Sequence, residues 1–268
     1  VEDLAALRHD RIEAPWLLEG PIDGESFQVY VEKLLLPTLR PGDIVEAVPG
    51  VVATQHSGDG KANQYFLRGF NLDHGTDFAV TVDGMPVNMP THGHGQGYAD
   101  LNFLIPDLVS GVRYRKGPYF ADSGDFSLAG SASLDYLSAL DAPFIETTLG
   151  ANRLRRLLAA GSRTRDDQTW LGAIELEGND GPWDVPERLR KVNAVVRYSQ
   201  GSPAQGFHIT GMAYRSHWTS TDQVPERLID SGELPRFGSL NPTDGGSTRR
   251  LSLSGKWFHN GPQGRTQV

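Results

Sequence analysis

Long runs of strictly alternating polarity in the second half of the chain constrain its fold more than any other feature. The run TWLGAIELEG places Trp170 and Ile174 on one side and Glu175 on the other. Two further runs, KVNAVVRYSQ from Lys191 and RLSLSGKWFH from Arg250, alternate in the same way. Successive side chains of a β-strand point to opposite faces, so each run predicts a strand with one apolar and one polar face.

The connections between these predicted strands alternate in length. RDDQ, GSPAQG and GPQG are tight turns, whereas GNDGPWDVPERLRK and the segment 219–248 are long. Short turns at one end and long loops at the other are typical of an outer-membrane β-barrel, as are aromatic residues near strand ends, here Trp170, Tyr198, Trp218 and Trp257. A soluble antiparallel sandwich has the same alternation, so this pattern alone leaves both architectures open.

Composition excludes several classes of function. The chain has no cysteine, which excludes disulfide bonds, thiolate zinc sites and cysteine nucleophiles. Its net charge of −8 provides no surplus of lysine and arginine for phosphate contacts, so we expect no nucleic-acid partner. No apolar run approaches the roughly 18 to 20 residues that a membrane helix requires. Any membrane-spanning part would therefore have to be built from strands.

The first half of the chain has a different character. SFQVYVEKLLLP and GDIVEAVPG predict two helices, the second with Asp43 and Glu46 in the spacing of a capping box. After Gly50 the helical period disappears, and short β-like runs follow, separated by clusters of Gly, Asn, Asp and Pro. These patterns predict a compact mixed α+β unit.

Four segments of this unit carry a resemblance to a known family. They are DIVEAVPGVV (43–52), YFLRGF (65–70), VTVDGMPV (80–87) and VSGVRYRKGP (109–118). In order and approximate spacing they resemble the plug domain of TonB-dependent outer-membrane receptors. In that family the plug lies inside a barrel of antiparallel strands and gates the active import of metal chelates, cobalamin or sugars, powered through TonB.

The resemblance implies an α+β plug domain over residues 1–140, with its core at about 42–140, followed over 141–268 by antiparallel transmembrane β-barrel strands. These strands are too few to close a barrel of the family's size, so we expect an incomplete barrel and interpret the chain as the N-terminal part of a longer receptor. A truncated receptor that binds a ligand without transporting it is the alternative.

The resemblance also implies a location and partners. We expect the outer membrane of a Gram-negative cell, contact with outer-membrane lipid, and TonB with its inner-membrane energising complex. No segment before Gly42 resembles a TonB box, so the contact with TonB is not assigned. The ligand is expected to be scarce, such as a ferric siderophore, another metal chelate or a metal ion. No enzymatic activity is expected, and no cofactor is required beyond such bound cargo.

The glycine-rich segment MPTHGHGQGYAD holds the candidate ligand residues. If the plug strands alternate in direction, this segment and the turn after GVVAT share one end of the plug, which faces outward in the resembling receptors, and His74 lies at the opposite end. Imidazole suits copper, zinc and nickel. The alternative is that the histidines only form hydrogen bonds with loop backbone. The predicted ligand contacts are His56, Asp59, Met89, His92, His94 and Tyr98, with His56, His92 and His94 as candidate metal ligands.

An enzyme is a distant alternative for the same segment. THGHGQG is similar to the Thr-His-x-His-x-Asp-His zinc motif of metallo-β-lactamase-like hydrolases. The positions of the Asp and the last His hold Gln96 and Gly97 in this chain. Because an open catalytic zinc site usually needs three good protein ligands, a zinc hydrolase built on the His-x-His pair is disfavoured.

Two basic residues are candidates for holding the plug in place. The resemblance implies that Arg68, in LRGF, and Lys116, in RYRK, pair with carboxylates of the barrel wall. Solvated charge on the polar face of a strand is the alternative. For Asp83 and Gly84 we expect only a tight turn.

Overall fold

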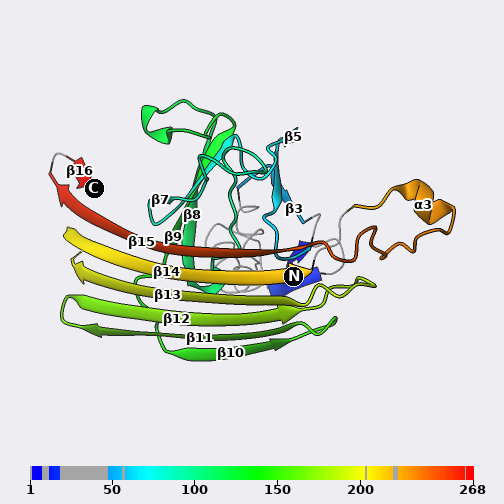
Figure 1. Cartoon of the computed structure of the whole chain (residues 1–268). Coiled ribbons are helices and arrows are strands. Elements are labelled where there is room, and N and C mark those ends of the chain that lie inside the picture. The colour runs from blue at the N-terminus through cyan, green and yellow to red at the C-terminus, as the bar shows by residue number, and fades with distance from the viewer. Residues whose placement is uncertain are drawn as a thin grey trace.

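The computed structural model describes the strands 2–7 and 12–18 and the residues 48–55, 58–202, 204–219, 223–262 and 264–268. A small plug lies against one face of a large, curved antiparallel sheet (Figure 1). The helices predicted from SFQVYVEKLLLP and from the start of GDIVEAVPG lie outside the described residues. In the part of the chain that the structure describes, no helix has the length and apolar character needed to cross a membrane.

Seven strands form the larger sheet in sequence order, each antiparallel to the next. They are β10 (Phe144–Leu149), β11 (Arg155–Arg165), β12 (Gln168–Asn179), β13 (Leu189–Gly201), β14 (Gln205–Thr219), β15 (Gly245–Gly261) and β16 (Gly264–Gln267). Tight turns join them at one end, and the longer connections at the other end include the short helix α3 (Glu226–Asp230) (Figure 1). Among the described strands the sheet is open, with β10 and β16 as its edges, which confirms the expected incomplete barrel.

The outer face of this sheet is apolar. Leu251 and Leu253 are 81% and 79% exposed, and Leu176 pairs in register with Leu157 on one side and Val192 on the other. The inner face, which meets the plug, carries the polar side chains, and its buried polar residues include Glu175, Lys191, Asn193, Arg197, Thr210 and Ser216. Apolar residues of the same face, Leu171, Val195 and Met212, belong to one buried core with the plug. A soluble sandwich buries its apolar face instead, so the arrangement matches an outer-membrane sheet.

Aromatic side chains cross the outer face near its tight turns. The ring of Trp170 lies 4.8 Å from that of Tyr198, and Tyr198 lies 5.9 Å from Phe207, which pairs in register with Trp257. Aromatic girdles of this kind mark the interface level of membrane barrels. Trp218, which the sequence grouped with these residues, is buried at 9% exposure and faces the plug.

The plug contains two small sheets. In one, β3 (Val51–Thr54) and β5 (Phe70–Asn71) flank β4 (Gln64–Leu67), and the other has the order β7-β6-β9-β8. Its strands are β6 (Phe78–Val82), β7 (Met85–Pro86), β8 (Val109–Lys116) and β9 (Gly130–Tyr136), with the 3-10 turns η3 (Pro106–Leu108) and η4 (Ala121–Ser123) beside them. A separate antiparallel hairpin pairs β1 (Glu2–Leu7) with β2 (Ile12–Leu18). Fully buried Phe78, Leu104 and Leu134 lie at the centre of the plug core.

Two tight turns reverse the chain inside the plug. Arg68 (φ 52°) and Gly69 (φ 83°) join β4 to β5, and Asp83 (φ 52°) and Gly84 (φ 86°) join β6 to β7. Two successive residues with positive φ form the hairpin turn whose twist matches that of the flanking strands. The tight turn expected at Asp83 and Gly84 is confirmed, whereas the turn at Arg68 and Gly69, which interrupts the run YFLRGF, was not expected. Because the chain runs back along β4 after the first turn, His74 lies at the same end as the β3–β4 turn and not at the predicted opposite end.

Candidate ligand-binding site

His74 is the buried centre of the candidate site. It follows β5 and is 2% exposed. Its Nδ1 lies 2.9 Å from the carbonyl oxygen of Asn63, and since a carbonyl only accepts, Nδ1 carries the proton and Nε2 keeps its lone pair. Burial is the largest influence on the pKa of His74 and lowers it, while the Asn63 carbonyl acts in the opposite direction. The ring is therefore neutral at neutral pH.

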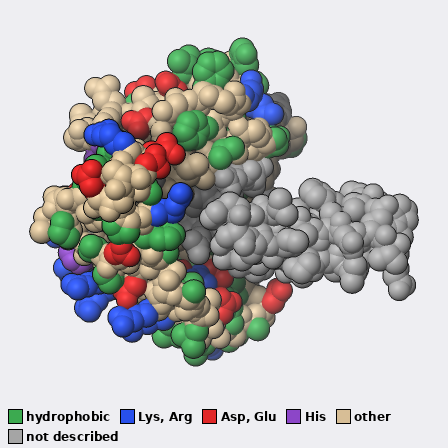
Figure 2. Space-filling model, turned by 90° about the vertical axis from the view of Figure 1, so that its right-hand side faces the viewer, with side chains coloured by type: hydrophobic (Ala, Val, Ile, Leu, Met, Phe, Trp, Pro, Cys, Tyr) green, Lys and Arg blue, Asp and Glu red, His purple; other side chains and the backbone are tan. Residues whose placement is uncertain are grey.

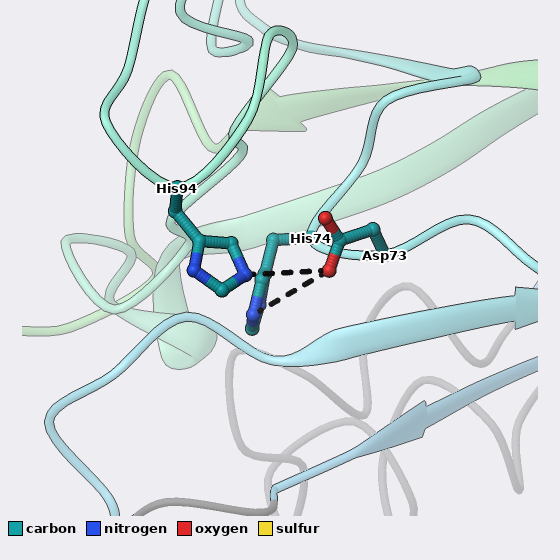
Figure 3. A group of neighbouring side chains, drawn as sticks. All are labelled: Asp73, His74 and His94. Atoms are coloured by element: carbon teal, nitrogen blue, oxygen red, sulfur yellow. Dashed lines mark ion pairs between the residues drawn. The ribbon is translucent and has the colours of Figure 1, made fainter.

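Asp73 and His94 complete a cluster around His74 (Figure 3). Nε2 of His94 lies 3.4 Å from Oδ1 of Asp73, and Nε2 of His74 lies 3.7 Å from the same oxygen. The two imidazole rings meet edge to face with centroids 4.4 Å apart. The side chains of His94 and Asp73 are 39% and 44% exposed, so solvent reaches the cluster from one side while His74 forms its buried floor.

His92 and Tyr98 lie beside this cluster and shape the loop that carries His94. Their rings stack with centroids 3.9 Å apart and planes 13° apart. Nδ1 of His92 accepts the backbone N–H of His94 at 3.1 Å, and the Tyr98 hydroxyl accepts the backbone N–H of Ala62 at 3.3 Å. Burial, more than the charge of Asp100, raises the pKa of Tyr98 to about 12. Tyr98 is therefore a neutral phenol at neutral pH.

Asn88 ties the same loop to the plug sheet. Its Oδ1 accepts the backbone N–H of Val80 at 2.7 Å, and its Nδ2 lies within 3.0 Å of the carbonyl oxygens of Gly75, Phe78 and Gly97. The side chain is buried at 8% exposure, where unpaired backbone groups would be costly. One amide side chain thus fixes the start of β6, the turn after β5 and the end of the histidine loop against one another.

The structure brings together part of the predicted ligand set. His94 joins Asp73 and His74, which the sequence did not single out as ligands, whereas His92 stacks on Tyr98. The missed signal is the Arg-Gly pair after β4, because recognising it as a hairpin turn would have returned NLDHGTD to the same end as HGHG. Ligand contact by His92, His94 and Tyr98 stays a prediction.

The remaining predicted ligand residues have different surroundings. Met89 is tied to Tyr98 through the backbone, since the Met89 N–H donates to the Tyr98 carbonyl at 2.9 Å, and its side chain is 43% exposed. His56 lies outside the described residues. Asp59 lies in the β3–β4 turn, against the large sheet. Ligand contact by these three residues stays a prediction.

The β3–β4 turn of the plug is docked on the large sheet at its long-loop end. Oδ2 of Asp59 accepts from Nδ2 of Asn179 at 2.6 Å, and the Asp59 N–H donates to Glu187 at 3.3 Å. A Cβ added to Gly60 would lie 2.1 Å from the Trp218 ring, so glycine permits this close approach. Figure 2 shows the molecule from this end, where acidic and basic side chains are interspersed.

Glu187 makes this docking contact sensitive to pH. The side chain is 2% exposed and accepts from Nε1 of Trp183 at 2.7 Å. Burial first, and the charge of Asp59 second, raise the pKa of Glu187 to about 7 from an ordinary value of 4.5. Because the pKa is higher in the folded state, the stability that this group contributes is fully present below pH 4.5 and is lost as pH rises through about 7.

We expect the β3–β4 turn to open more readily as the pH rises through about 7, and Glu187→Gln to remove most of that change. The glutamine keeps an oxygen that accepts from Trp183 but cannot ionise. Hydrogen exchange of the amides of residues 58–61, corrected for its intrinsic pH dependence, measures the effect. The matched control is Asp184→Asn, an exposed carboxylate of the same loop. An equal pH profile in wild type and Glu187→Gln would contradict the assignment.

A buried ion pair joins the plug to β13. Nη1 of Arg197 lies 2.5 Å from Oδ2 of Asp83, and the two side chains are 5% and 2% exposed. The other carboxylate oxygen of Asp83 accepts the backbone N–H of Tyr136 at 3.1 Å. On the returning strand β7, the carbonyl of Pro86 accepts from Arg250 of β15 at 3.2 Å. Asp83, for which only a turn was expected, thus also holds the plug on the wall, and that expectation was incomplete.

A second ionic contact centres on Arg156 of β11. Its guanidinium pairs with Asp107 of η3, and its Nε donates to Glu175 of β12 at 2.6 Å. Glu175, 1% exposed, also accepts from Nδ2 of Asn193 at 2.8 Å, and the same amide reaches the carbonyl of Asn102 in the plug at 3.0 Å. The wall therefore supplies both the charge and the amide that face the plug.

The two basic residues predicted to hold the plug lie elsewhere. Arg68 is exposed in the β4–β5 turn, and Lys116 is exposed at the end of β8, with its Nζ 5.7 Å from the ring centroid of Tyr114. Neither forms an ion pair with β10–β16 in the described part of the chain. Their contact with a barrel wall stays a prediction.

Comparison with known proteins identifies the class of this fold. Residues 30–131 match the family model of the TonB-dependent Receptor Plug Domain. This part of the chain thus matches that plug domain, and in the described residues it is followed by antiparallel strands that do not close a barrel.

Solved structures with the same fold include the ferric citrate transporter FecA, with a TM-score of 0.65 and 16% identity over 81% of this chain and 34% of that chain. The copper transporter OprC matches with a TM-score of 0.62 and 14% identity over 83% and 32%. The ferric enterobactin receptor PfeA of Pseudomonas aeruginosa matches with a TM-score of 0.56 and 14% identity over 84% and 37%. This chain spans about a third of the length of each. At these identities the likeness defines the fold alone.

Proposed function

We propose that this chain contributes the plug and barrel strands of an outer-membrane, TonB-dependent transporter that imports a metal chelate, such as a ferric siderophore, or a metal ion. The observation that carries the proposal is the pairing of a polar, plug-bearing inner face with an apolar outer face on one sheet. An apolar outer face is stable against lipid, and a plug held on the polar side blocks the passage that the sheet would enclose.

The plug contacts suit a domain that has to move during transport. Hydrogen bonds and ion pairs, including those of Asp83 and Asp107, join the plug to the wall beside a shared apolar core. When the plug moves away from the sheet, water that enters between them can replace the hydrogen bonds and ion pairs, whereas the apolar contacts lose their burial. In the proposed cycle, ligand binds at the exposed end that carries His94, and TonB pulls on the plug from the periplasmic side to open the passage.

The neighbours' names support the class of cargo. Two of the similar structures are described as receptors or transporters for iron compounds, ferric citrate and ferric enterobactin, and a third as a copper transporter. A histidine and carboxylate cluster on the solvent-facing side of the plug suits a metal or its complex.

The two alternative functions receive less support. A zinc hydrolase built on the His-x-His pair would need His92 and His94 to converge, but His92 stacks on Tyr98 and uses Nδ1 to accept from the loop backbone. Experiment can distinguish a receptor that binds ligand without transporting it. Cells that express such a receptor would take up the ligand no faster than cells that lack the receptor.

Uptake by Gram-negative cells tests the proposal. Cells that express the protein, cells that lack it, and cells that lack TonB are supplied with radiolabelled copper, zinc or ferric chelates. We expect uptake of one cargo to require both the protein and TonB. Binding to cells without such uptake would support the non-transporting alternative, and uptake that is independent of TonB would refute the proposed mechanism.

A further inference from the structure

We infer that Asp73, His74 and His94 form a binding site for a divalent transition-metal ion of the copper, zinc and nickel class. The inference rests on the proposed function and deepens it, because it names the subsite on the plug and the chemistry of the ion. Two imidazole nitrogens and one carboxylate oxygen are a donor set that suits these ions. The set differs from the one predicted from sequence, since His74 and Asp73 replace His56 and His92.

The distances between the donor atoms fit a metal centre. An ion that binds imidazole and carboxylate at roughly 2.0–2.2 Å holds tetrahedral donors about 3.4 Å apart. Oδ1 of Asp73 lies 3.4 Å from Nε2 of His94 and 3.7 Å from Nε2 of His74, and the donor atoms all lie within 4.8 Å of one another. The third distance joins the imidazole nitrogens of His74 and His94. A small movement of the exposed His94 side chain, whose residue lies between two glycines, brings this distance into range.

Neighbouring groups orient both imidazoles for this role. The Asn63 carbonyl holds the proton of His74 on Nδ1, which directs the lone pair of Nε2 toward Asp73. A backbone carbonyl on the far nitrogen is a common partner of a metal-binding histidine, because it fixes the tautomer and the ring orientation. His92 accepts the His94 N–H and stacks on Tyr98, so it is a positioning residue for the loop and not a ligand.

The surroundings leave coordination positions open on the solvent side. His74 closes the floor, while Asp73 and His94 are about two-fifths exposed. Water or the donor atoms of a chelator can therefore complete the coordination, so the ion could arrive free or as a complex. All three ligands lie in described residues of the plug, and the carbonyl that orients His74 also belongs to the plug, at Asn63. The site is therefore part of the plug itself.

Calorimetric titration of the purified protein with Cu²⁺, Zn²⁺ and Ni²⁺ tests the site. Wild type is expected to bind one equivalent of at least one of these ions. His94→Ala and Asp73→Asn should each weaken binding by about tenfold or more, because each removes a direct ligand from partly exposed positions that tolerate substitution. His259→Ala is the matched control, because it removes an exposed imidazole on β15, away from the cluster, and it should stay within about threefold of wild type.

Electron paramagnetic resonance of the Cu²⁺-loaded protein adds a direct readout of the ligands. Nitrogen coupling should show two imidazoles in wild type and His259→Ala, and one in His94→Ala and in His74→Gln. No saturable binding by wild type, or equal binding by wild type and the two ligand variants, would overturn the inference.

Uptake separates this inference from the proposed transport. Transport of a metal chelate that persists in His94→Ala and Asp73→Asn would overturn the metal site as a cargo subsite and leave the transporter standing. Loss of metal uptake in these variants, with the His259→Ala control unaffected, is the result expected. Parallel titrations with free Cu²⁺ and with Cu²⁺ bound to a chelator that leaves positions open distinguish a free ion from a complex as cargo.

Discussion

Arg197→Ala is expected to weaken the docking of the plug by about 3–5 kcal/mol, because it leaves Asp83 buried without its cation. Asp83 would keep one backbone donor, the N–H of Tyr136, on a carboxylate that is 2% exposed. Hydrogen exchange of the purified protein measures the effect. We expect faster exchange over β6 and β9, which the Asp83 carboxylate and turn connect, and little change in β11 and β12.

The control for Arg197→Ala lies on the same strand. Arg190 is exposed on β13, so Arg190→Ala removes the same charge without uncovering a buried partner. The double variant Arg197→Gln with Asp83→Asn should recover part of the loss, since asparagine also accepts positive φ and both partners become neutral. If Arg197→Ala changed exchange no more than Arg190→Ala, the buried pair would not hold the plug.

Asn88→Ala is expected to destabilise the plug by about 2–4 kcal/mol and to loosen the loop that carries His94. Alanine leaves the buried N–H of Val80 and the carbonyls of Gly75 and Gly97 without the side chain that pairs with them, and each unsatisfied buried group costs about 1–3 kcal/mol. Thermal unfolding of the purified protein gives the stability change, and exchange of residues 89–98 reports on the loop.

An exposed asparagine of the plug provides the comparison for Asn88. Oδ1 of Asn71 accepts the backbone N–H of Asp73 at 2.8 Å, but water can replace it, so Asn71→Ala should cost less than about 1 kcal/mol. Similar losses for the two variants would mean that the burial of Asn88 adds nothing. A stable Asn88→Ala protein with an ordered loop would show that the β6 and β7 pairing alone positions His94.

The consequence for ligand binding follows from the same contacts. His94 is an exposed ligand of the inferred metal site. The amide of Asn88 fixes the end of its loop at Gly97, and the stack of His92 on Tyr98 fixes the loop within. The plug thereby combines a rigid floor at His74 with a movable outer ligand. A site of this form can change its affinity when the plug is pulled, because the floor and the loop belong to different segments joined through Asn88.

The sequence by itself determined the elements that depend on local spacing. Alternation along TWLGAIELEG assigned Trp170 and Ile174 to one face and Glu175 to the other, as the structure has them, because a strand's side chains alternate whatever it packs against. The glycine-rich loop and the position of the Asp83 turn were also predictable, since both follow from the backbone freedom of their residues. The four plug segments indicated the family on the same local basis.

Only the tertiary structure decided which groups meet. The Arg68 turn brings His74 beside His94, and the ion pair of Asp83 with Arg197 joins residues 114 positions apart. Beyond the Arg68–Gly69 pair, which marks the first turn, no pattern in the sequence encodes these contacts, because a tight turn anywhere between two residues reverses the direction of all that follows. The polarity of the large sheet was open for a similar reason. Alternation creates an apolar and a polar face, but only the plug's buried contacts determine that the polar face is the inner one.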